Sequence, residues 1–212
     1  MIFLPRLYAI LDASNFPVSE DLLFAADEFI AAGVSLIQYR NKTEDAQVML
    51  AQARELRKRS RAGAPAPHGP RPRLIMNDRS DIGLAAEFDG AHVGQDDLSP
   101  EAARKIIGPE RWLGVSTHNP RQVIEADKTS ADYIAIGPVF ATGSKTNHDP
   151  VIGLAGVRQA RALTRKPLVA IGGITRENCR SVIDAGADSV AVISDLIPDP
   201  GKSAEEFLRI LG

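Results

Sequence analysis

Eight short apolar runs recur along the chain, and a longer stretch with the spacing of an amphipathic helix follows each of them. The runs are almost continuously apolar, which is typical of parallel strands buried on both faces. We predict strands at residues 7–11, 35–39, 74–76, 90–93, 112–115, 133–136, 168–171 and 189–193.

The intervening stretches carry apolar stripes and recognisable helix ends. One stripe comprises Leu22, Ala26, Phe29 and Ile30, and Gly33, a residue typical of helix C-termini, follows it. A second stripe comprises Met49, Leu50, Ala53 and Leu56. Three helix-start signals accompany the stripes: Thr43 before Glu44 and Asp45, Ser99 before Pro100, and Asn119 before Pro120.

Strict alternation of eight strands and eight helices within 212 residues predicts the α/β class and a single-domain (β/α)8 TIM barrel over 1–212. A doubly wound open sheet is the alternative, but it carries a glycine-rich loop after its first strand. Residues 11–15 contain no glycine, which favours the barrel. A Pro-, Gly- and Arg-rich tract at 62–73 predicts a loop insertion without regular structure, with a basic lid or contact patch as the alternative.

Composition narrows the function classes. The 25 basic and 27 acidic residues give a net charge of −2, so no sequence-wide field attracts nucleic acid or an anionic membrane. The single cysteine, Cys179, excludes an intrachain disulfide and suits a reducing compartment. No apolar run approaches the ~18 residues of a membrane span, and no basic region of a signal peptide precedes the first run. We expect a cytoplasmic globular protein without nucleic-acid or membrane partners. The sequence leaves open whether the protein forms a homo-oligomer.

Polar and glycine residues collect in or just after the predicted strands. For the second to fourth strands they are Gln38, Arg40, Lys42, Asn77, Asp78, His92 and Asp97. For the fifth to eighth strands they are Ser116, Thr142, Gly143, Ser144, Lys145, Gly172, Gly173 and Ser194. Since a barrel places its chemistry at the carboxyl ends of its strands, these residues form the candidate site.

Each group also has a structural alternative when it is taken alone. Asp78 and Asn119 could cap the third and fifth helices, and His92 could be a hydrogen-bonded core histidine. Arg40 could be a solvated surface charge, as could Lys42, and the two adjacent glycines could form only a tight turn. Caps and surface charges have no reason to gather at one end of a barrel, so the joint pattern favours a site.

The charges sort into two sets that suit a metal and phosphate groups. Arg40, Lys42 and Lys145 supply cations, and Asp78 and Asp97 supply carboxylates. Mg²⁺ is usually held by one or two carboxylates and by substrate phosphate oxygens, whereas zinc would need a Cys/His set. This half of the rim therefore predicts a diphosphate–Mg²⁺ site.

The loops after the last two strands have a different character. They combine Gly172 and Gly173 with Ile193 and Ser194, and they offer backbone N–H groups without a cation. Barrels frequently bind a phosphate there. Two anion sites on one rim predict two small phosphorylated substrates and a group transfer in which one of them loses diphosphate.

Read in order, these segments resemble the thiamine phosphate synthase (thiamine-phosphate pyrophosphorylase) family over nearly the whole chain. The matching motifs are Gln38-x-Arg40-x-Lys42; Asn77-Asp78-Arg79-x-Asp81; DGAHVGQDD at 89–97; LGVS-x-H at 113–118; ADY at 131–133; GPVF-x-T-x-SK at 137–145; and AIGGI at 170–174. The set in this order is far more specific than any one motif.

The resemblance implies that 4-amino-2-methyl-5-hydroxymethylpyrimidine diphosphate and thiazole phosphate give thiamine phosphate and diphosphate by a dissociative mechanism, with Mg²⁺ as cofactor. It implies pyrimidine-diphosphate contacts from Gln38, Arg40, Lys42, Asn77, His92, Ser116 and Lys145, with Arg40 and Lys145 catalytic. It implies Asp78 and Asp97 as metal ligands. It implies thiazole-phosphate contacts from Thr142, Gly143, Ser144, Gly173, Ile193 and Ser194.

Three departures from the family pattern accompany the match. Asn41 stands where Glu is common, Ala141 and Ser144 replace the usual Pro and Thr, and Asp195 puts a carboxylate beside the expected phosphate site. We expect the Asp195 side chain to point away from that site. A thiazole tautomerase-like isomerase and a non-catalytic phosphate-binding barrel are the alternative functions.

Overall fold

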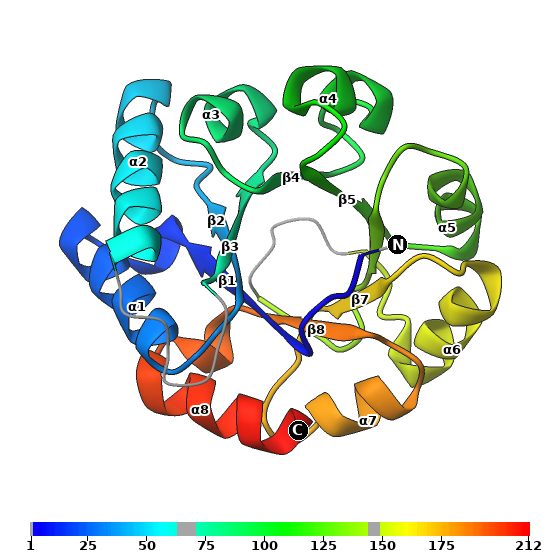
Figure 1. Ribbon diagram of the computed structural model, residues 1–212. Coiled ribbons are helices and arrows are strands. Elements are labelled where there is room, and N and C mark those ends of the chain that lie inside the picture. Colours follow the sequence, from blue (N-terminus) through cyan, green and yellow to red (C-terminus); the bar gives the residue numbers. More distant parts are fainter. Residues whose placement is uncertain (1, 63–70, 144–148) are drawn as a thin grey trace.

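A computed structural model describes residues 2–62, 71–143 and 149–212, and these form a closed barrel of eight parallel strands ringed by helices (Figure 1). Neighbours in sequence are neighbours in the sheet, and the last strand pairs with the first. The strands are β1 (Leu7–Asp12), β2 (Leu36–Arg40), β3 (Arg73–Asn77), β4 (Gly90–Val93), β5 (Trp112–Thr117), β6 (Tyr133–Ile136), β7 (Leu168–Ile171) and β8 (Ser189–Val192).

The helices follow the strands in turn. They are α1 (Ser19–Ala31), α2 (Ala46–Ala62), α3 (Ser80–Ala85), α4 (Pro100–Ile107), α5 (Pro120–Asp127), α6 (Gly153–Leu163), α7 (Cys179–Asp184) and α8 (Pro200–Leu211), with short 3₁₀ turns η1 (Ala13–Asn15) and η2 (Ser194–Leu196). The predicted fold class and all eight predicted strands are confirmed. The predicted caps Ser99 and Asn119 are confirmed too, since each side chain accepts a hydrogen bond from the first turn of its helix.

Two predicted boundaries are wrong. The second helix begins at Ala46, not beside Thr43, because the Asp45 carboxylate accepts hydrogen bonds from the backbone of Gln47 and Val48 at 2.8 and 2.9 Å. The tract 62–73 is regular at both ends. Its first residue closes α2, and Arg73 opens β3, where its guanidinium also lies over the Trp112 ring. Residues 63–70 of the tract lie outside the described residues.

Two apolar layers explain why the strand sequences are almost continuously hydrophobic. On β2, Leu36 belongs to the cluster inside the barrel, and its neighbour Ile37 belongs to the cluster between strands and helices. Both are almost completely buried, so each strand needs apolar side chains on both faces. Phe29 of α1 lies in the outer cluster, and its full burial stabilises the fold by roughly 1.5–3 kcal/mol.

A repeated polar clamp ties the amino ends of the strands together. Three times, an aspartate just before an even-numbered strand accepts hydrogen bonds from a backbone N–H of the preceding odd-numbered strand and from an arginine of the helix that leads into that odd-numbered strand. The trios are Asp89, Leu74 and Arg57; Asp132, Leu113 and Arg104; and Asp188, Leu168 and Arg161. In each, the N–H···O distance from the strand is 2.8 Å. These charges at the amino end of the barrel therefore serve the fold.

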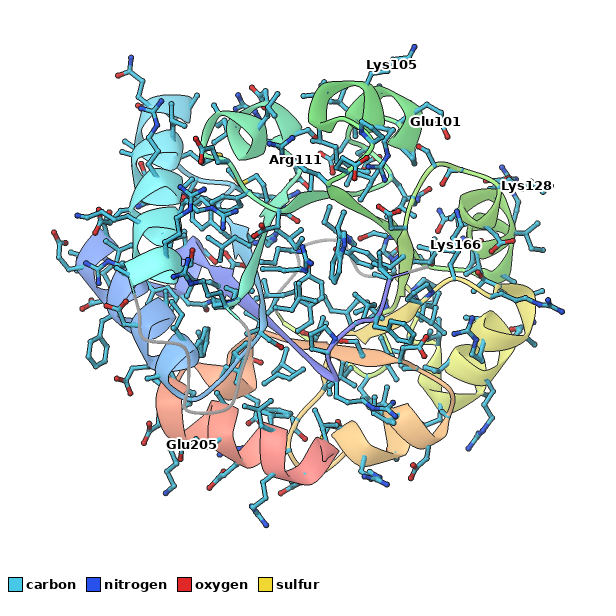
Figure 2. All side chains as sticks on the ribbon, viewed as in Figure 1. Glu101, Lys105, Arg111, Lys128, Lys166 and Glu205 are labelled. Carbon is cyan, nitrogen blue, oxygen red and sulfur yellow. The ribbon has the colours of Figure 1, made fainter. Side chains whose placement is uncertain are left out.

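The outer faces of the helices carry the remaining charge. Glu101 and Lys105 on α4 and Glu205 on α8 point away from the barrel (Figure 2). No helix within the described ranges has the length and apolarity needed to cross a membrane. Those polar residues singled out from the sequence that the structure describes lie instead at the carboxyl ends of the strands or in the loops that follow them.

Candidate active site

Five predicted substrate-binding side chains line one cavity in the barrel, which we call the polar cavity. Its polar lining consists of Gln38, Arg40, Asn77, His92 and Ser116, and Tyr8, Ile10, Ala135, Val169, Ile171, Ala191 and Ile193 complete it. All eight strands contribute to this lining. The polar groups come from β2 to β5, and β6 to β8 contribute apolar groups, so the cavity has one polar and one apolar side.

Arg40 is held by a partner that the sequence analysis did not single out. Its guanidinium donates a hydrogen bond to the carboxylate of Asp12, which is almost completely buried at the end of β1. The backbone N–H and hydroxyl of Ser14 also bind this carboxylate. The Arg40 side chain is only 16 % exposed, so it is not a solvated surface charge. Asp12 and Arg40 lie opposite each other in the β1–β2 register, a relation that a single strand sequence does not reveal.

The two predicted metal ligands lie together. The carboxyl groups of Asp78 and Asp97 face each other within hydrogen-bonding range, and Lys42 forms an ion pair with Asp78 at 3.0 Å. Burial raises the pKa of the Asp78 carboxyl above its usual value, and the facing Asp97 raises this pKa further, against the opposite effect of Lys42. Two adjacent carboxylates are a donor pair suited to a divalent cation.

Asp78 is not the cap of α3, which settles one structural alternative. The cap position belongs to Arg79, which makes no side-chain cap bond. Asp78 itself has a left-handed backbone with φ 59°, and its N–H donates to the His92 carbonyl oxygen at 2.7 Å. Non-glycine residues rarely adopt this conformation, and the strain cost of order 1–3 kcal/mol persists where it positions a functional group.

Asn77 carries an unsatisfied donor into the same region. Its side-chain Nδ2 is buried and has no hydrogen-bond partner in the described part of the chain. Leaving a buried donor unpaired costs roughly 1–3 kcal/mol. Because Asn77 lines the polar cavity, an anionic ligand there would satisfy this donor.

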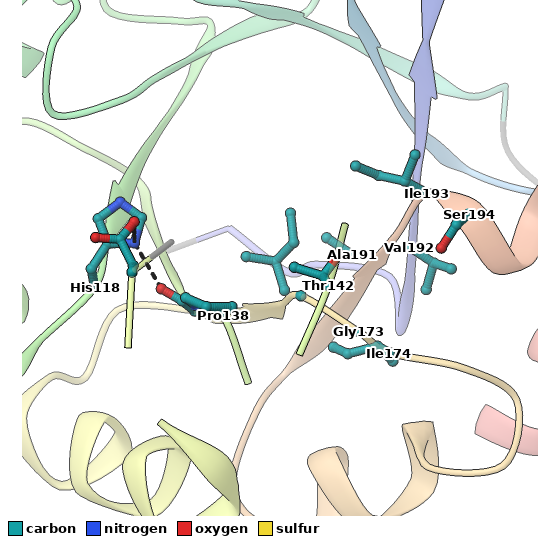
Figure 3. A pocket seen from close by; sticks show the side chains of 13 residues that line it. His118, Pro138, Thr142, Gly173, Ile174, Ala191, Val192, Ile193 and Ser194 are labelled. Carbon is teal, nitrogen blue, oxygen red and sulfur yellow. Dashed lines mark hydrogen bonds and ion pairs between the residues drawn. The ribbon is translucent and has the colours of Figure 1, made fainter. Parts of the chain in front are cut away.

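A second pocket opens beside the first and contains four of the six predicted thiazole-phosphate residues (Figure 3). We call it the glycine pocket. Its lining consists of His118, Gly137, Pro138, Thr142, Asp149, Ile171, Gly172, Gly173, Ile174, Ala191, Val192, Ile193 and Ser194. The predicted Gly143 is described but does not line this pocket, and Ser144 and Lys145 lie outside the described residues.

The backbone shape of the glycine pocket depends on two glycines. Gly172 has φ 103° and Gly173 has φ 62°, in the left-handed region that favours glycine. A Cβ at Gly173 would lie 2.5 Å from the Ala141 carbonyl oxygen, and one at Gly172 would lie 2.6 Å from the Pro138 Cα. The pair therefore lets the β7 loop approach the β6 loop, and it is more than an interchangeable tight turn.

His118 is a pocket residue to which the sequence analysis gave no role. Its Nδ1 lies 2.7 Å from the Gly137 carbonyl oxygen and 3.3 Å from the Asp149 carboxylate (Figure 3). The available signal was its place two residues after Ser116 at the end of β5. Its partners belong to the loop after β6, so only the fold brings them together.

The expectation for Asp195 is confirmed. Its carboxylate accepts hydrogen bonds from the backbone N–H of Arg176 at 2.8 Å and from the Arg176 Nε at 3.1 Å. Glu206 on α8 binds the same guanidinium at 2.5 Å. The negative charge is thus paired with Arg176, and Asp195 does not line the glycine pocket, although Ser194 does.

The polar cavity and the glycine pocket share a wall. Ile171, Ala191 and Ile193 line both of them. One site thus has arginine, amide, imidazole and hydroxyl groups on one side and glycine-rich backbone on the other, with apolar side chains between. Two ligands bound there would meet across an apolar surface that excludes water.

Several known proteins with similar sequences carry the name thiamine-phosphate synthase. The family model described as thiamine monophosphate synthase matches residues 7–196. A thiamine-phosphate synthase of Koribacter versatilis is 59 % identical over 211 residues, covering 98 % of this chain and 96 % of the relative. A thiamine-phosphate synthase of Chloroflexus aurantiacus is 41 % identical over 210 residues, which cover 97 % of this chain and 92 % of the relative. The solved structure of a thiamine phosphate pyrophosphorylase from Pyrococcus furiosus superposes with a TM-score of 0.84 at 33 % sequence identity. The superposition covers 97 % of this chain and 95 % of the solved chain.

Proposed function

The chain belongs to the thiamine monophosphate synthase family, and from that premise we propose how its two pockets divide the work of synthesis. Its activity is thiamine-phosphate synthesis, a transferase reaction of thiamine biosynthesis. The pyrimidine diphosphate occupies the polar cavity, and the thiazole phosphate occupies the glycine pocket. The observation that carries this assignment is the wall common to both, formed by Ile171, Ala191 and Ile193.

The diphosphate end of the first substrate faces the cationic side of the site. Arg40, oriented by Asp12, places a fixed positive charge there, and the unpaired Asn77 Nδ2 supplies a further donor. Ser116 and Lys42 add a hydroxyl and an ammonium group to the same set. The resemblance adds Lys145 from the loop after β6, which lies outside the described residues. Donors fixed before the reaction stabilise charge as it develops on the leaving group.

We propose Mg²⁺ as the cofactor, held by Asp78 and Asp97. The donor set fits this ion, since two adjacent carboxylates with water and phosphate oxygens are its usual ligands. In the described part of the chain, no cluster of three or more His, Cys, Asp or Glu side chains could form an all-protein metal cage. The substrate phosphates would thus complete the coordination. Bound Mg²⁺ would supply charge neutralisation at the departing diphosphate.

The bond changes need no catalytic base. The C–O bond between the pyrimidine methylene and the diphosphate breaks, and its electron pair leaves with the diphosphate. The aminopyrimidine stabilises the resulting methylene cation until the thiazole nitrogen donates its lone pair to form the new C–N bond. Gln38 and His92 orient the pyrimidine ring, and the apolar wall keeps water away from the cation.

The thiazole phosphate binds where backbone groups are exposed. Gly173 and Ser194 line the glycine pocket together with Thr142 and Ile193, and the pairing of Asp195 with Arg176 keeps that carboxylate away from the phosphate. Gly143 and Ser144 complete the set implied by the resemblance. Positioning of two substrates in one site supplies a large part of the rate acceleration, up to about 7–11 kcal/mol at ideal geometry.

The direct test mixes both substrates with and without Mg²⁺ and follows diphosphate release and thiamine phosphate formation. We expect both products in equal amounts, and only when the metal is present. Formation of an isomerised thiazole phosphate alone would support a tautomerase-like function. Ligand binding without any product would support a binding barrel. The proposed partners are thus two small phosphorylated molecules. The proposed compartment is the cytoplasm, because a single cysteine without a disulfide partner in the chain suits a reducing environment.

A further inference from the structure

A hydrogen-bond chain crosses the interior of the barrel from one polar-cavity residue to another. Its consecutive links are Gln38 Nε2 to Tyr8 Oη at 2.9 Å, Tyr8 Oη to Tyr133 Oη at 2.9 Å, Tyr133 Oη to His92 Nδ1 at 3.1 Å, and His92 Nε2 to Ser116 Oγ at 2.9 Å. Tyr8 and Tyr133 are at most 1 % exposed. The function proposed above assigns no task to either tyrosine.

The sequence makes room for this chain at one position. In the sheet register, Gly114 of β5 lies between His92 of β4 and Tyr133 of β6. A Cβ at Gly114 would lie 2.1 Å from the Tyr133 Cζ and 2.4 Å from the His92 Nδ1. Because glycine leaves this space open, the two side chains meet across the intervening strand.

The orientation of the Gln38 amide favours one direction for this hydrogen-bond chain. Gln38 Nε2 can only donate, so the Tyr8 oxygen accepts from it, and when each hydroxyl proton is used within the hydrogen-bond chain the Tyr8 proton goes to Tyr133. Tyr133 then donates its own proton to His92 Nδ1. A neutral imidazole that accepts at Nδ1 carries its proton on Nε2. That proton is donated to Ser116 Oγ, which leaves the Ser116 hydroxyl proton available for a ligand.

We propose that Tyr8 and Tyr133 are positioning residues that hold His92 as the neutral Nε2–H tautomer and thereby make Ser116 a hydrogen-bond donor toward the polar cavity. Both tyrosines stay protonated, since burial raises the pKa of each hydroxyl well above its usual value. In a hydrogen-bond chain that runs the opposite way, the Gln38 amide would be rotated so that its oxygen faces Tyr8, and Ser116 would donate to His92.

The direction fits the substrate that occupies the cavity, and this step rests on the proposed function. At one end, the Gln38 side-chain oxygen is left to accept a hydrogen bond, as the exocyclic amino group of an aminopyrimidine requires. At the other end, Ser116 donates, as the anionic diphosphate requires. The reversed chain would present a donor to the amino group and an acceptor to the anion, which is the wrong pairing at both ends.

The test is the histidine tautomer in the unliganded protein, read from long-range ¹H–¹⁵N spectra of ¹⁵N-histidine-labelled enzyme. The His92 signals are identified by their loss in His92→Gln. We expect an Nε2–H tautomer in the wild type. Tyr133→Phe removes the donor to Nδ1, so we expect a shift toward a mixture with the Nδ1–H form. Tyr8→Phe leaves Tyr133 without its fixed donor and gives a smaller shift in the same direction.

Tyr39→Phe is the matched control. Tyr39 is as buried as Tyr8 and Tyr133. Its hydroxyl binds Gln52 and Asn41, which do not belong to the hydrogen-bond chain from Gln38 to Ser116, so the His92 spectrum should stay unchanged. An Nδ1–H tautomer in the wild type would overturn the proposal. So would a His92 spectrum that Tyr133→Phe leaves unaltered while the variant melts like the control.

Kinetics give an independent readout. Tyr133→Phe is expected to lower kcat by about fivefold to tenfold, the worth of one hydrogen bond, whereas Tyr39→Phe changes it by less than about twofold. Absence of any synthase activity in the wild type would overturn the proposed function, but the spectra would still decide the direction of the chain.

Discussion

The two halves of the barrel rim use opposite means to prepare for an anion. On β2 to β4, charged side chains converge, with Arg40 held by Asp12 and Lys42 held by Asp78. On β7 and β8, the rim has two left-handed glycines, and the carboxylate of Asp195, which follows β8, is bound by Arg176. In the proposed function, the first half stabilises charge that changes during the reaction, and the second holds a charge that does not change.

This difference has a consequence for substitution. If function in the charged half depends on side-chain chemistry, as proposed, an isosteric neutral replacement should impair it. In the glycine half, function depends on backbone shape, so the smallest added side chain removes it. Three of the following four experiments test one side of this contrast, and the remaining one compares the rim with the opposite end of the barrel.

The largest loss is expected from Asp78→Asn or Asp97→Asn. Neutralising either carboxylate should weaken the proposed Mg²⁺ site, and kcat/KM at fixed Mg²⁺ should fall by on the order of a hundredfold or more. Steady-state kinetics over a Mg²⁺ titration measure this, and the half-saturating Mg²⁺ concentration should rise. Asp81→Asn is the control, because Asp81 is exposed and forms an ion pair with Arg79. An unchanged metal titration in Asp97→Asn would remove Asp97 from the metal site.

The next effect is expected from Gly173→Ala. The added Cβ meets the Ala141 carbonyl oxygen, and the site must distort, so KM for thiazole phosphate should rise by on the order of tenfold or more. Gly108→Ala is the matched control, since Gly108 also has a positive φ, of 80°, but no atom within 4 Å of the added Cβ. It shares the backbone strain without the clash. Equal changes of KM in both variants would show that the shape of the glycine pocket is not what holds the thiazole phosphate.

A third experiment separates the rim from the opposite end of the barrel. Arg104 donates to Asp132 and to the Gly108 and Ser130 carbonyl oxygens, so Arg104→Ala should lower the free energy of unfolding by about 2–3 kcal/mol. Denaturant titration measures the loss of stability. The kcat at 25 °C should stay within about twofold of the wild-type value, because the clamp lies away from the rim. Arg121→Ala, which breaks only an exposed pair with Glu125, should cost less than about 0.5 kcal/mol. A large kcat loss in Arg104→Ala without unfolding would contradict the division of labour between the two ends.

The smallest effect is expected from Asp195→Asn. Asp195 is bound to Arg176 and does not line the glycine pocket, so KM for thiazole phosphate should change by less than about threefold. Initial rates at varied thiazole phosphate measure it. A tenfold decrease of KM would mean that the Asp195 charge repels the phosphate after all.

The sequence predicted the barrel well because its signal is local. Strands buried on both faces need uninterrupted apolar runs, as the inward Leu36 and outward Ile37 illustrate. The helix caps Ser99 and Asn119 are equally local, and both were predicted. Where two signals competed, as with Thr43 and Asp45, a sequence pattern alone did not decide which residue caps the helix.

The site was predicted only as far as single residues reveal it. Arg40, Asp78 and His92 stand out because polar groups are unusual at the ends of apolar strands. Asp12, His118 and the two interior tyrosines do not, because their roles come from partners on other strands. Those pairings depend on the register between distant segments, and register is a property of the closed sheet.

The most direct measurement of the central claim is a crystal structure with Mg²⁺, diphosphate and thiamine phosphate bound together. The account predicts the metal between Asp78 and Asp97, the diphosphate against Arg40 and Asn77, and the thiazole phosphate group at Gly173 and Ser194. Diphosphate and metal bound away from Asp78 and Asp97, or a thiazole phosphate outside the glycine pocket, would contradict the division of the rim into a charged half and a backbone half.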